Sequence, residues 1–220
     1  MLYSVKYWDA ALFVIKEKCA ENFLLKTIIY RTNSAIGRGI RGRENVRVQW
    51  NRNSKLSYTP QFLTLDNTPW FPLMGEIHYS RVSNGRWEEE LYKMKAGGIE
   101  LVSAYTIWIH HEEVEGEWDF SGDRDLRKFL QTIKNCGLHC ILRIGPWAHG
   151  EVRNGGFPDW LMQKEKEGQL VTRTNDPKYL RYVREFYGKI AEQARGLLLS
   201  DDGPVAMIQI ENEYGHVGGR

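Results

Sequence analysis

Glutamates recur in the second part of this sequence, each soon after an apolar run. The last such run, Ile208–Gly215 (IQIENEYG), ends in two glutamates separated by one asparagine. Paired carboxyl groups can divide the work of catalysis, because one donates a proton while the other attacks the substrate or activates water. Five glutamates occupy such positions: Glu76, Glu112, Glu151, Glu211 and Glu213. Their recurrence predicts a polar cleft suited to carboxylate chemistry, of which glycoside hydrolysis is the best-known form.

Glu211 and Glu213 do not form the whole catalytic pair. Residues two apart on a strand are separated by about 6.6 Å, which alone would suit two carboxylates beside one glycosidic bond. Their side chains point to the same side of the strand, however, so they cannot flank one sugar ring. At most one of them is catalytic, and its partner must come from another strand.

Aromatic and imidazole side chains accompany these glutamates. Flat rings pack on sugar faces, although aromatic residues are first of all core material. The HHEE run at 110–113 raises metal binding as an alternative. Adjacent histidines on a strand point apart, and their spacing is not that of a helical zinc site, so we predict neither a metal nor a cofactor. The residues expected to line the cleft with the glutamates are His78, His110, His111, Trp108 and Trp147.

The elements that would position these residues alternate from residue 61 onward. Apolar periodicity, caps and glycine stops predict helices over 85–98, 121–137 and 175–194. Near-continuous apolar runs predict strands within 62–81 and over 99–108, 139–145 and 204–212. This order predicts a parallel sheet, covered on both faces, with helices packed outside. Ligands bind at the carboxyl edge of such a sheet, where the polar residues gather.

Four segments resemble the catalytic barrel of the glycoside hydrolase family 35 β-galactosidases. They are GEIHYSR, YTIWIHHE, RIGPWAHGEVRNGGFPDWL and IQIENEYG, in this order over Gln61–Gly215. The resemblance implies an α/β fold, the first half of a (β/α)₈ TIM barrel with about four parallel strands. It also implies a retaining hydrolase that removes terminal β-linked galactose from oligo- or polysaccharides, with a galactoside or galactose-containing glycan as its partner.

The resemblance assigns roles to particular residues. Glu213 matches the general acid/base, and Asn212 matches the residue that hydrogen-bonds the sugar 2-hydroxyl group. Tyr105, Gly150 and Glu151 match the galactose-binding subsite. Glu211 is then a carboxylate of the barrel interior, and a buried neighbour of like charge would help keep Glu213 protonated.

The sequence departs from the family pattern beside this subsite. Trp147 stands where many members have Tyr, and Gly150 where many have Ala. Val152 and Arg153 replace a common Trp-Glu pair. The linkage preference and the identity of the sugar therefore stay open.

The family's nucleophile lies on a later strand, and no carboxylate of this chain matches it. Residues 61–220 are fewer than the about 250 of a complete barrel. We therefore expect half a barrel, open at its first and fourth strands, that self-associates through these edges and has no turnover alone. Two other hypotheses remain: a half-barrel that binds galactosides without catalysis, and a basic-arm protein that binds a partner or nucleic acid.

Residues 1–60 form a basic segment that the resemblance does not cover. They carry 11 Lys/Arg and 4 Asp/Glu, whereas the rest carries 19 and 24. A short Arg/Gly run with Trp50 as a stacking platform suits nucleic acid, but a solvated linker explains it better. No apolar run is long enough to span a membrane, and no signal peptide is recognisable, so the compartment is not readable. Free buried thiols are expected at Cys136 and Cys140.

Overall fold

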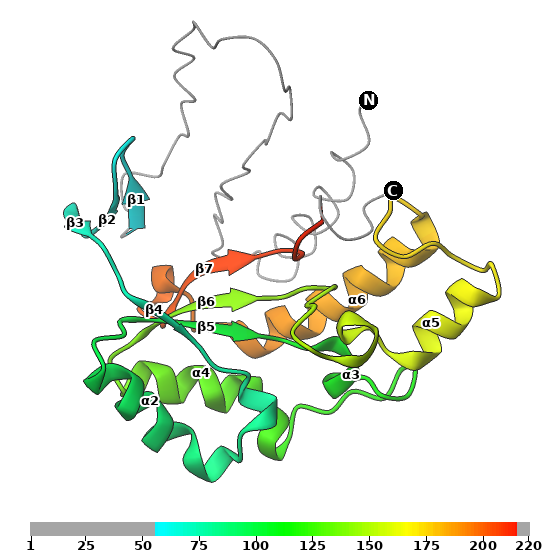
Figure 1. The fold of residues 1–220 in the computed structure, drawn as a ribbon, viewed down its shortest axis with the longest axis horizontal. Coiled ribbons are helices and arrows are strands. Elements are labelled where there is room, and N and C mark those ends of the chain that lie inside the picture. The colour runs from blue at the N-terminus through cyan, green and yellow to red at the C-terminus, as the bar shows by residue number, and fades with distance from the viewer. Residues whose placement is uncertain (1–55, 215–220) are drawn as a thin grey trace, which may run out of the picture.

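The computed structural model describes residues 56–214, which form two sheets and a set of helices (Figure 1). The expectations for the basic segment therefore lie almost entirely outside the described residues. The exception is strand β1 (Leu56–Tyr58), which pairs residue by residue with strand β2 (Leu63–Leu65).

The small sheet is an antiparallel hairpin extended by one strand. Strand β2 pairs with β3 (Thr68–Trp70), and β1 pairs with the other side of β2. Asp66 and Asn67 form the two-residue turn with φ values of 49° and 63°. Positive φ at both central positions is the type I′ geometry that matches the twist of a hairpin. This turn lies in the LDNTP segment, whose Asp-Asn pair tolerates positive φ.

The second sheet contains the four predicted parallel strands. They are β4 (Met74–Glu76), β5 (Leu101–Tyr105), β6 (His139–Arg143) and β7 (Val205–Gln209), hydrogen-bonded in that order. Pairing places Tyr105, Arg143 and Gln209 in one row at the carboxyl ends. The register therefore brings side chains from three strands to the edge where a ligand was expected.

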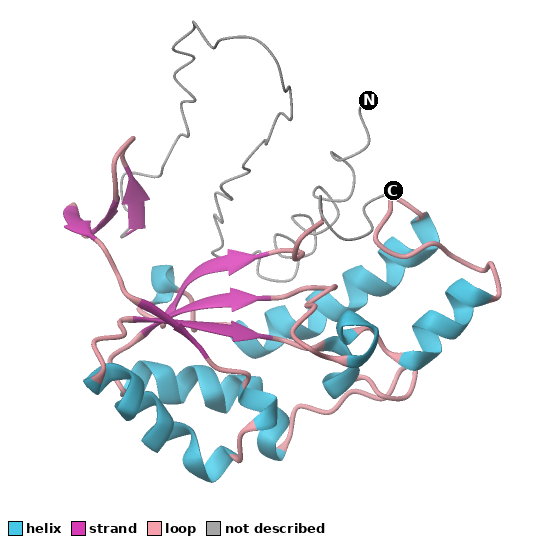
Figure 2. Cartoon of the chain, viewed as in Figure 1, coloured by secondary structure: helices cyan, strands magenta, loops and turns pink. Residues whose placement is uncertain are grey.

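The three predicted helices are present, and they gather on one side of this sheet (Figure 2). They are α2 (Trp87–Ala96), α4 (Leu126–Asn135) and α6 (Pro177–Ala194). The caps follow the sequence: Asp125 accepts a hydrogen bond from the Lys128 backbone N–H, and Asp176 from that of Lys178, both at 2.8 Å. Helices α4 and α6 therefore each begin where a capping aspartate satisfies a free N–H group, whereas the N-terminal residue before α2, Arg86, makes no side-chain cap.

Several short helices were not predicted. Helix α3 (Trp108–His111) follows β5 directly, and α5 (Asp159–Lys166) follows the loop after β6. The expectation that His110 and His111 lie on a strand is therefore wrong. Single 3₁₀ turns are η1 (Tyr79–Arg81), η2 (Asn84–Arg86), η3 (Gly122–Arg124), η4 (Arg153–Gly156) and η5 (Leu199–Asp201).

The core lies between the parallel sheet and the helices. All five residues of β5 are buried, but β6 alternates between buried and half-buried positions. Coverage of both faces, as predicted, therefore holds for β5 and not for β6 or β7. On the face away from the helices, Leu56 and Trp70 of the small sheet pack with Leu101 at the start of β5. The aromatic members of the main core are Tyr79, Trp87, Trp108, Phe129, Phe157, Tyr179, Phe186 and Tyr187.

The repeat of strand and helix is that of a (β/α)₈ barrel, and the described residues contain four of its strands. Cys136 and Cys140 are buried free thiols, as predicted. None of the helices among residues 56–214 is long and apolar enough to cross a membrane.

Candidate active site

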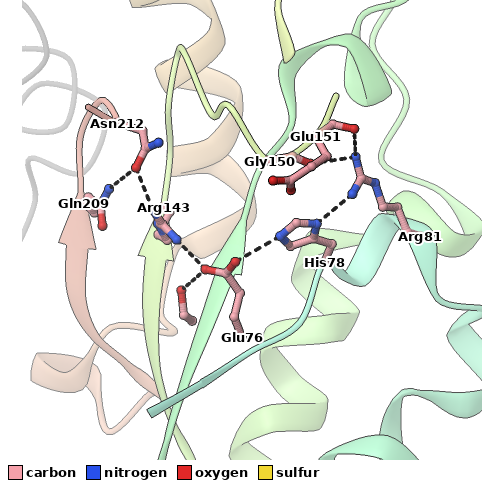
Figure 3. A network of polar contacts seen from close by, with 9 residues as sticks. Glu76, His78, Arg81, Arg143, Gly150, Glu151, Gln209 and Asn212 are labelled. Atoms are coloured by element: carbon pink, nitrogen blue, oxygen red, sulfur yellow. Dashed lines mark hydrogen bonds and ion pairs between the residues drawn. The ribbon is translucent and has the colours of Figure 1, made fainter. Parts of the chain in front are cut away.

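Arg143, the last residue of β6, lies at the centre of the carboxyl edge. Its guanidinium group lies 3.7 Å from the centre of the Tyr105 ring and forms an ion pair with Glu76 of β4. Its Nη2 donates to Asn212 Oδ1 at 2.8 Å, just beyond β7 (Figure 3). Arg143 of β6 therefore contacts residues of β4, of β5 and of the segment that follows β7.

Glu76 accepts hydrogen bonds on both carboxylate oxygens. Ser103 Oγ donates to Oε2 at 2.8 Å, and His78 Nε2 lies 3.1 Å from Oε1. Burial alone would raise the pKa of Glu76, but the bonds from Ser103 and His78 and the charge of the guanidinium outweigh it and lower the pKa. Glu76 is therefore an ionised carboxylate that its neighbours already occupy.

Arg81 joins β4 to the loop after β6. Its Nη1 lies 3.0 Å from His78 Nδ1, and its Nη2 donates to the carbonyl oxygens of Gly150 and Glu151 at 2.9 and 3.1 Å (Figure 3). Gly150 and Glu151 have φ values of 50° and 49°, in the left-handed region. The loop is thus held in an unusual conformation at the position of the expected sugar-binding glutamate.

The segment after β7 is also in an unusual conformation. Glu211 and Glu213 have φ values of 63° and 49°, which non-glycine residues seldom adopt. Such strained backbone clusters at functional sites, where the surrounding structure maintains it. Asn212 is half-buried between them, whereas Glu213 is exposed.

The phenol of Tyr105 is influenced by the charges of several neighbouring side chains. Burial raises the pKa of Tyr105 to about 12, the charge of Arg143 opposes this, and the negative charges of Glu76, Glu213 and Glu151 add to it. Three glutamates from three different strand ends therefore lie within electrostatic reach of one phenol. That phenol stays protonated at neutral pH and can donate a hydrogen bond.

Glu211 is paired with a cation. Arg173, from the loop before α6, contacts its carboxylate at 2.7 Å, with only 5% and 2% of the two side chains exposed. Arg173 also donates to the Asn212 carbonyl oxygen at 2.9 Å. Arg173 therefore compensates the charge of Glu211 and connects this side chain to the segment after β7.

Trp147 packs beside the ion pair of Arg173 and Glu211. The guanidinium of Arg173 lies 4.8 Å from the centre of its ring. Another neighbour of the Trp147 ring is Gly155, where a Cβ atom would lie 2.2 Å from the ring. The asparagine–glycine–glycine run at 154–156 therefore leaves room for a tryptophan that packs on backbone.

Three residues predicted for the cleft lie in the core instead. Glu112 is buried, where burial raises its pKa, and it accepts hydrogen bonds from Trp108 Nε1 and the Gly116 N–H at 2.6 and 2.8 Å. Trp108 stacks on Phe186 at 4.6 Å between ring centres. His111 bonds to the Tyr79 hydroxyl at 2.6 Å. These placements follow from helix α3, which turns the side chains away from the strand edge.

His110 remains near the edge, where its Nδ1 lies 2.8 Å from Ser80 Oγ. Residues 56–214 contain no group of three or more His, Cys, Asp or Glu side chains that could hold a metal ion.

Sequence reasoning missed the arginines and the amide that organise the site. Arg143 carries a visible signal, because a charged residue inside the apolar run HCILRIG requires a buried partner. Arg173 stands in a polar loop and carries no such signal. The site residues found only in the structure are Arg81, Ser103, Arg143, Arg173 and Gln209.

Comparison with known proteins finds similar sequences among β-galactosidases. A β-galactosidase of Mus musculus is 38% identical over 164 residues, which cover 74% of this chain and 25% of that protein. A β-galactosidase of Homo sapiens is 37% identical over 164 residues (74% and 24%), and one of Xanthomonas manihotis 37% over 150 residues (68% and 25%). The chain thus spans about a quarter of the length of these curated relatives.

A crystal structure of β-galactosidase from the psychrophilic Marinomonas ef1 aligns with a TM-score of 0.49 at 21% identity, covering 66% of this chain and 22% of that one. The model of the family described as glycosyl hydrolases family 35 matches residues 62–219, which is well over half of the sequence. The chain belongs to glycosyl hydrolase family 35.

Proposed function

We propose that this chain carries the acid/base half of the active site of a retaining β-galactosidase. The observation that supports this most is that Arg143 lies 3.7 Å from the centre of the Tyr105 ring and donates at 2.8 Å to Asn212, the neighbour of Glu213. The charges of Glu151 and Glu213 also act on the Tyr105 phenol. The relatives with 37–38% identity bear the name β-galactosidase. Galactosides are therefore the substrate class proposed for the whole protein.

In this mechanism Glu213 protonates the glycosidic oxygen and later activates the water that releases the sugar. The Asn212 amide donates to the sugar 2-hydroxyl group, a contact that strengthens in the transition state. Tyr105, whose pKa is about 12, keeps its proton and donates a hydrogen bond from its hydroxyl group to a galactose oxygen, and Glu151 accepts hydrogen bonds from sugar hydroxyl groups. Gly150 lets the loop approach the sugar without a side chain.

The nucleophile in this proposal comes from outside the 220 residues. Among the edge carboxylates, Glu76 is bound by Arg143 and Glu211 by Arg173, so neither is free to attack an anomeric carbon. We accordingly expect residues 1–220 alone to bind galactose without hydrolysing a galactoside, because a glycosyl-enzyme intermediate requires the nucleophile.

The test is hydrolysis of a chromogenic β-galactoside by residues 1–220 alone and by the full-length protein, meaning the longer protein that this proposal requires, with residues 1–220 and the nucleophile in one chain. We expect turnover only from the longer protein, and Glu213→Gln should lower it by about 10²–10⁴-fold. The matched control is Glu89→Gln, which removes an exposed i,i+4 ion pair with Lys93 on α2. Wild-type turnover by the Glu213→Gln protein would overturn the acid/base assignment, and turnover by residues 1–220 would overturn the position of the nucleophile.

A further inference from the structure

We propose that Glu76 is a positioning residue that orients Asn212 through Arg143 and the Glu151 loop through His78 and Arg81. The inference rests on the proposed function and extends it to a residue that touches no substrate. The contacts form one continuous path from β7 to the loop after β6, with Glu76 at its middle (Figure 3).

The first arm of this path, from Glu76 through Arg143 to Asn212, fixes the orientation of the Asn212 amide group. Arginine has only donors, so Arg143 Nη2 identifies Oδ1 of Asn212 as the acceptor. Gln209 Nε2 also lies 3.5 Å from this oxygen. With Oδ1 turned toward two donors, the Nδ2 donor points away from them and is available to a sugar hydroxyl group.

Arg143 depends on Glu76 for its own position. Its Nε is buried without a hydrogen-bond partner among the described residues, and only 17% of its side chain is exposed. The remaining contacts of its guanidinium are Glu76, Asn212 and the face of Tyr105. Glu76 is the anion in this set, so it supplies most of the electrostatic attraction.

The second arm of the path, from Glu76 through His78 and Arg81 to the Glu151 loop, fixes the tautomer of His78. Because Arg81 can only donate, His78 Nδ1 must accept from it, and the ring proton is then on Nε2. That proton faces Glu76 Oε1 at 3.1 Å. Through Arg81 the same arm holds the carbonyl oxygens of Gly150 and Glu151, whose backbone is left-handed.

The carboxylate charge is what allows both arms to exist together. Oε1 accepts from His78, and Oε2 accepts from Ser103 and Arg143. A glutamine of the same size has one acceptor oxygen and one NH₂ group. Its NH₂ group would face either the Arg143 or the His78 donor, and in both orientations the negative charge that attracts Arg143 is gone, so the contact between residue 76 and Arg143 is weakened.

The experiment compares Glu76→Gln with wild type in the full-length protein on two aryl glycosides, a β-galactoside and its 2-deoxy analogue. The analogue lacks the hydroxyl group that Asn212 contacts, so it cannot respond to a misoriented amide. On the galactoside we expect kcat/KM to fall by about tenfold or more, mainly in kcat, because this contact strengthens in the transition state. On the 2-deoxy analogue we expect a fall of less than about threefold.

Asn212→Ala is the positive control and should show the same selectivity, while Glu89→Gln should leave both rates unchanged. If Glu76→Gln does not fold, judged by its thermal melt, Arg143→Lys cuts the first arm and keeps the positive charge. Equal losses on both substrates, or no loss, would overturn the positioning role. Wild-type turnover by Glu213→Gln would instead overturn the proposed function.

Discussion

At the level of single residues, two arginines hold the site together, Arg173 buried and Arg143 half-buried. Arg143 joins Glu76 to Asn212, and Arg173 joins Glu211 to the backbone beside Asn212. Glu213, the candidate acid/base, and Asn212 therefore follow a strand whose end is contacted by both arginines. Breaking the Arg173–Glu211 pair is costly, because the partner left behind is a buried, uncompensated charge, whereas Glu76 is exposed.

Replacement of Arg173 by methionine tests this cost. The Glu211 carboxylate, 2% exposed, would lose its cation, so we expect the free energy of unfolding to fall by about 3–5 kcal/mol. Chemical denaturation followed by circular dichroism measures it. The double variant Arg173→Met/Glu211→Gln should recover much of the loss, since it leaves no unpaired charge. A single variant as stable as wild type would contradict this account.

Gly155 should not tolerate alanine. The added Cβ would collide with the Trp147 ring, and the φ of +61° already disfavours a side chain, so we expect a loss of about 2–4 kcal/mol and a shift in tryptophan fluorescence. Gly168→Ala is the matched control, because its φ is +71° and nothing lies within 4 Å of the new Cβ. The two variants separate the collision from backbone strain; equal losses would show that Trp147 plays no part.

At the scale of elements, helix α3 and turn η1 are joined through His111. Its Nε2 accepts from the Tyr79 hydroxyl, and its Nδ1 donates to the Asp119 carbonyl oxygen at 2.9 Å. Burial lowers the pKa of His111 to about 4, and that of the neighbouring His110 also to about 4. Both imidazoles are therefore neutral in the folded protein.

The consequence is a stability that depends on pH in a defined direction. The unfolded chain takes up protons near the ordinary histidine pKa of about 6.5, but the folded chain does so only near 4. The stabilisation is thus fully present above about pH 6.5 and declines as the pH falls toward 4, by about 3 kcal/mol for His111. His111→Gln should flatten a large part of this slope in melts between pH 7 and 4. An unchanged slope would contradict the assignment.

At the scale of the whole molecule, the four parallel strands form an open sheet within residues 56–214. Strands β4 and β7 each pair on one side there. Phe71 and Leu73, just before β4, and Met74, its first residue, are 70%, 60% and 57% exposed. Unpaired strand edges and exposed apolar side chains favour association. The apolar segment lies next to the edge that a closed barrel would pair.

We therefore expect residues 1–220, purified alone, to self-associate with increasing concentration in sedimentation velocity experiments. The variant Leu73→Lys/Met74→Lys should reduce association, because lysine on an exposed edge opposes pairing. The variant Glu89→Gln, on the surface of α2, should not. A monomer with a sharp two-state melt would show that the edges are covered.

Much of the framework was predictable from local patterns. Helices α4 and α6 begin at their aspartate caps, α2 ends at its glycines, and the positions Leu126, Phe129, Leu130 and Ile133 of α4 are all buried. The short helix α3 was not predictable, because YTIWIHH continues an apolar run that is equally compatible with a strand. That one turn moved Glu112, Trp108 and His111 from the expected cleft into the core.

The sequence by itself determined the alternation of strands and helices and the family, because periodicity, caps and motif order are local properties of the chain. It also identified Asn212 and Glu213 as candidates. Only the tertiary structure decided which charges are paired. Arg173 is 38 residues from Glu211, and Arg143 is 67 residues from Glu76. Such pairings depend on strand register and loop path, which no local pattern encodes, and they separate the carboxylates that anchor the site from those left free for chemistry.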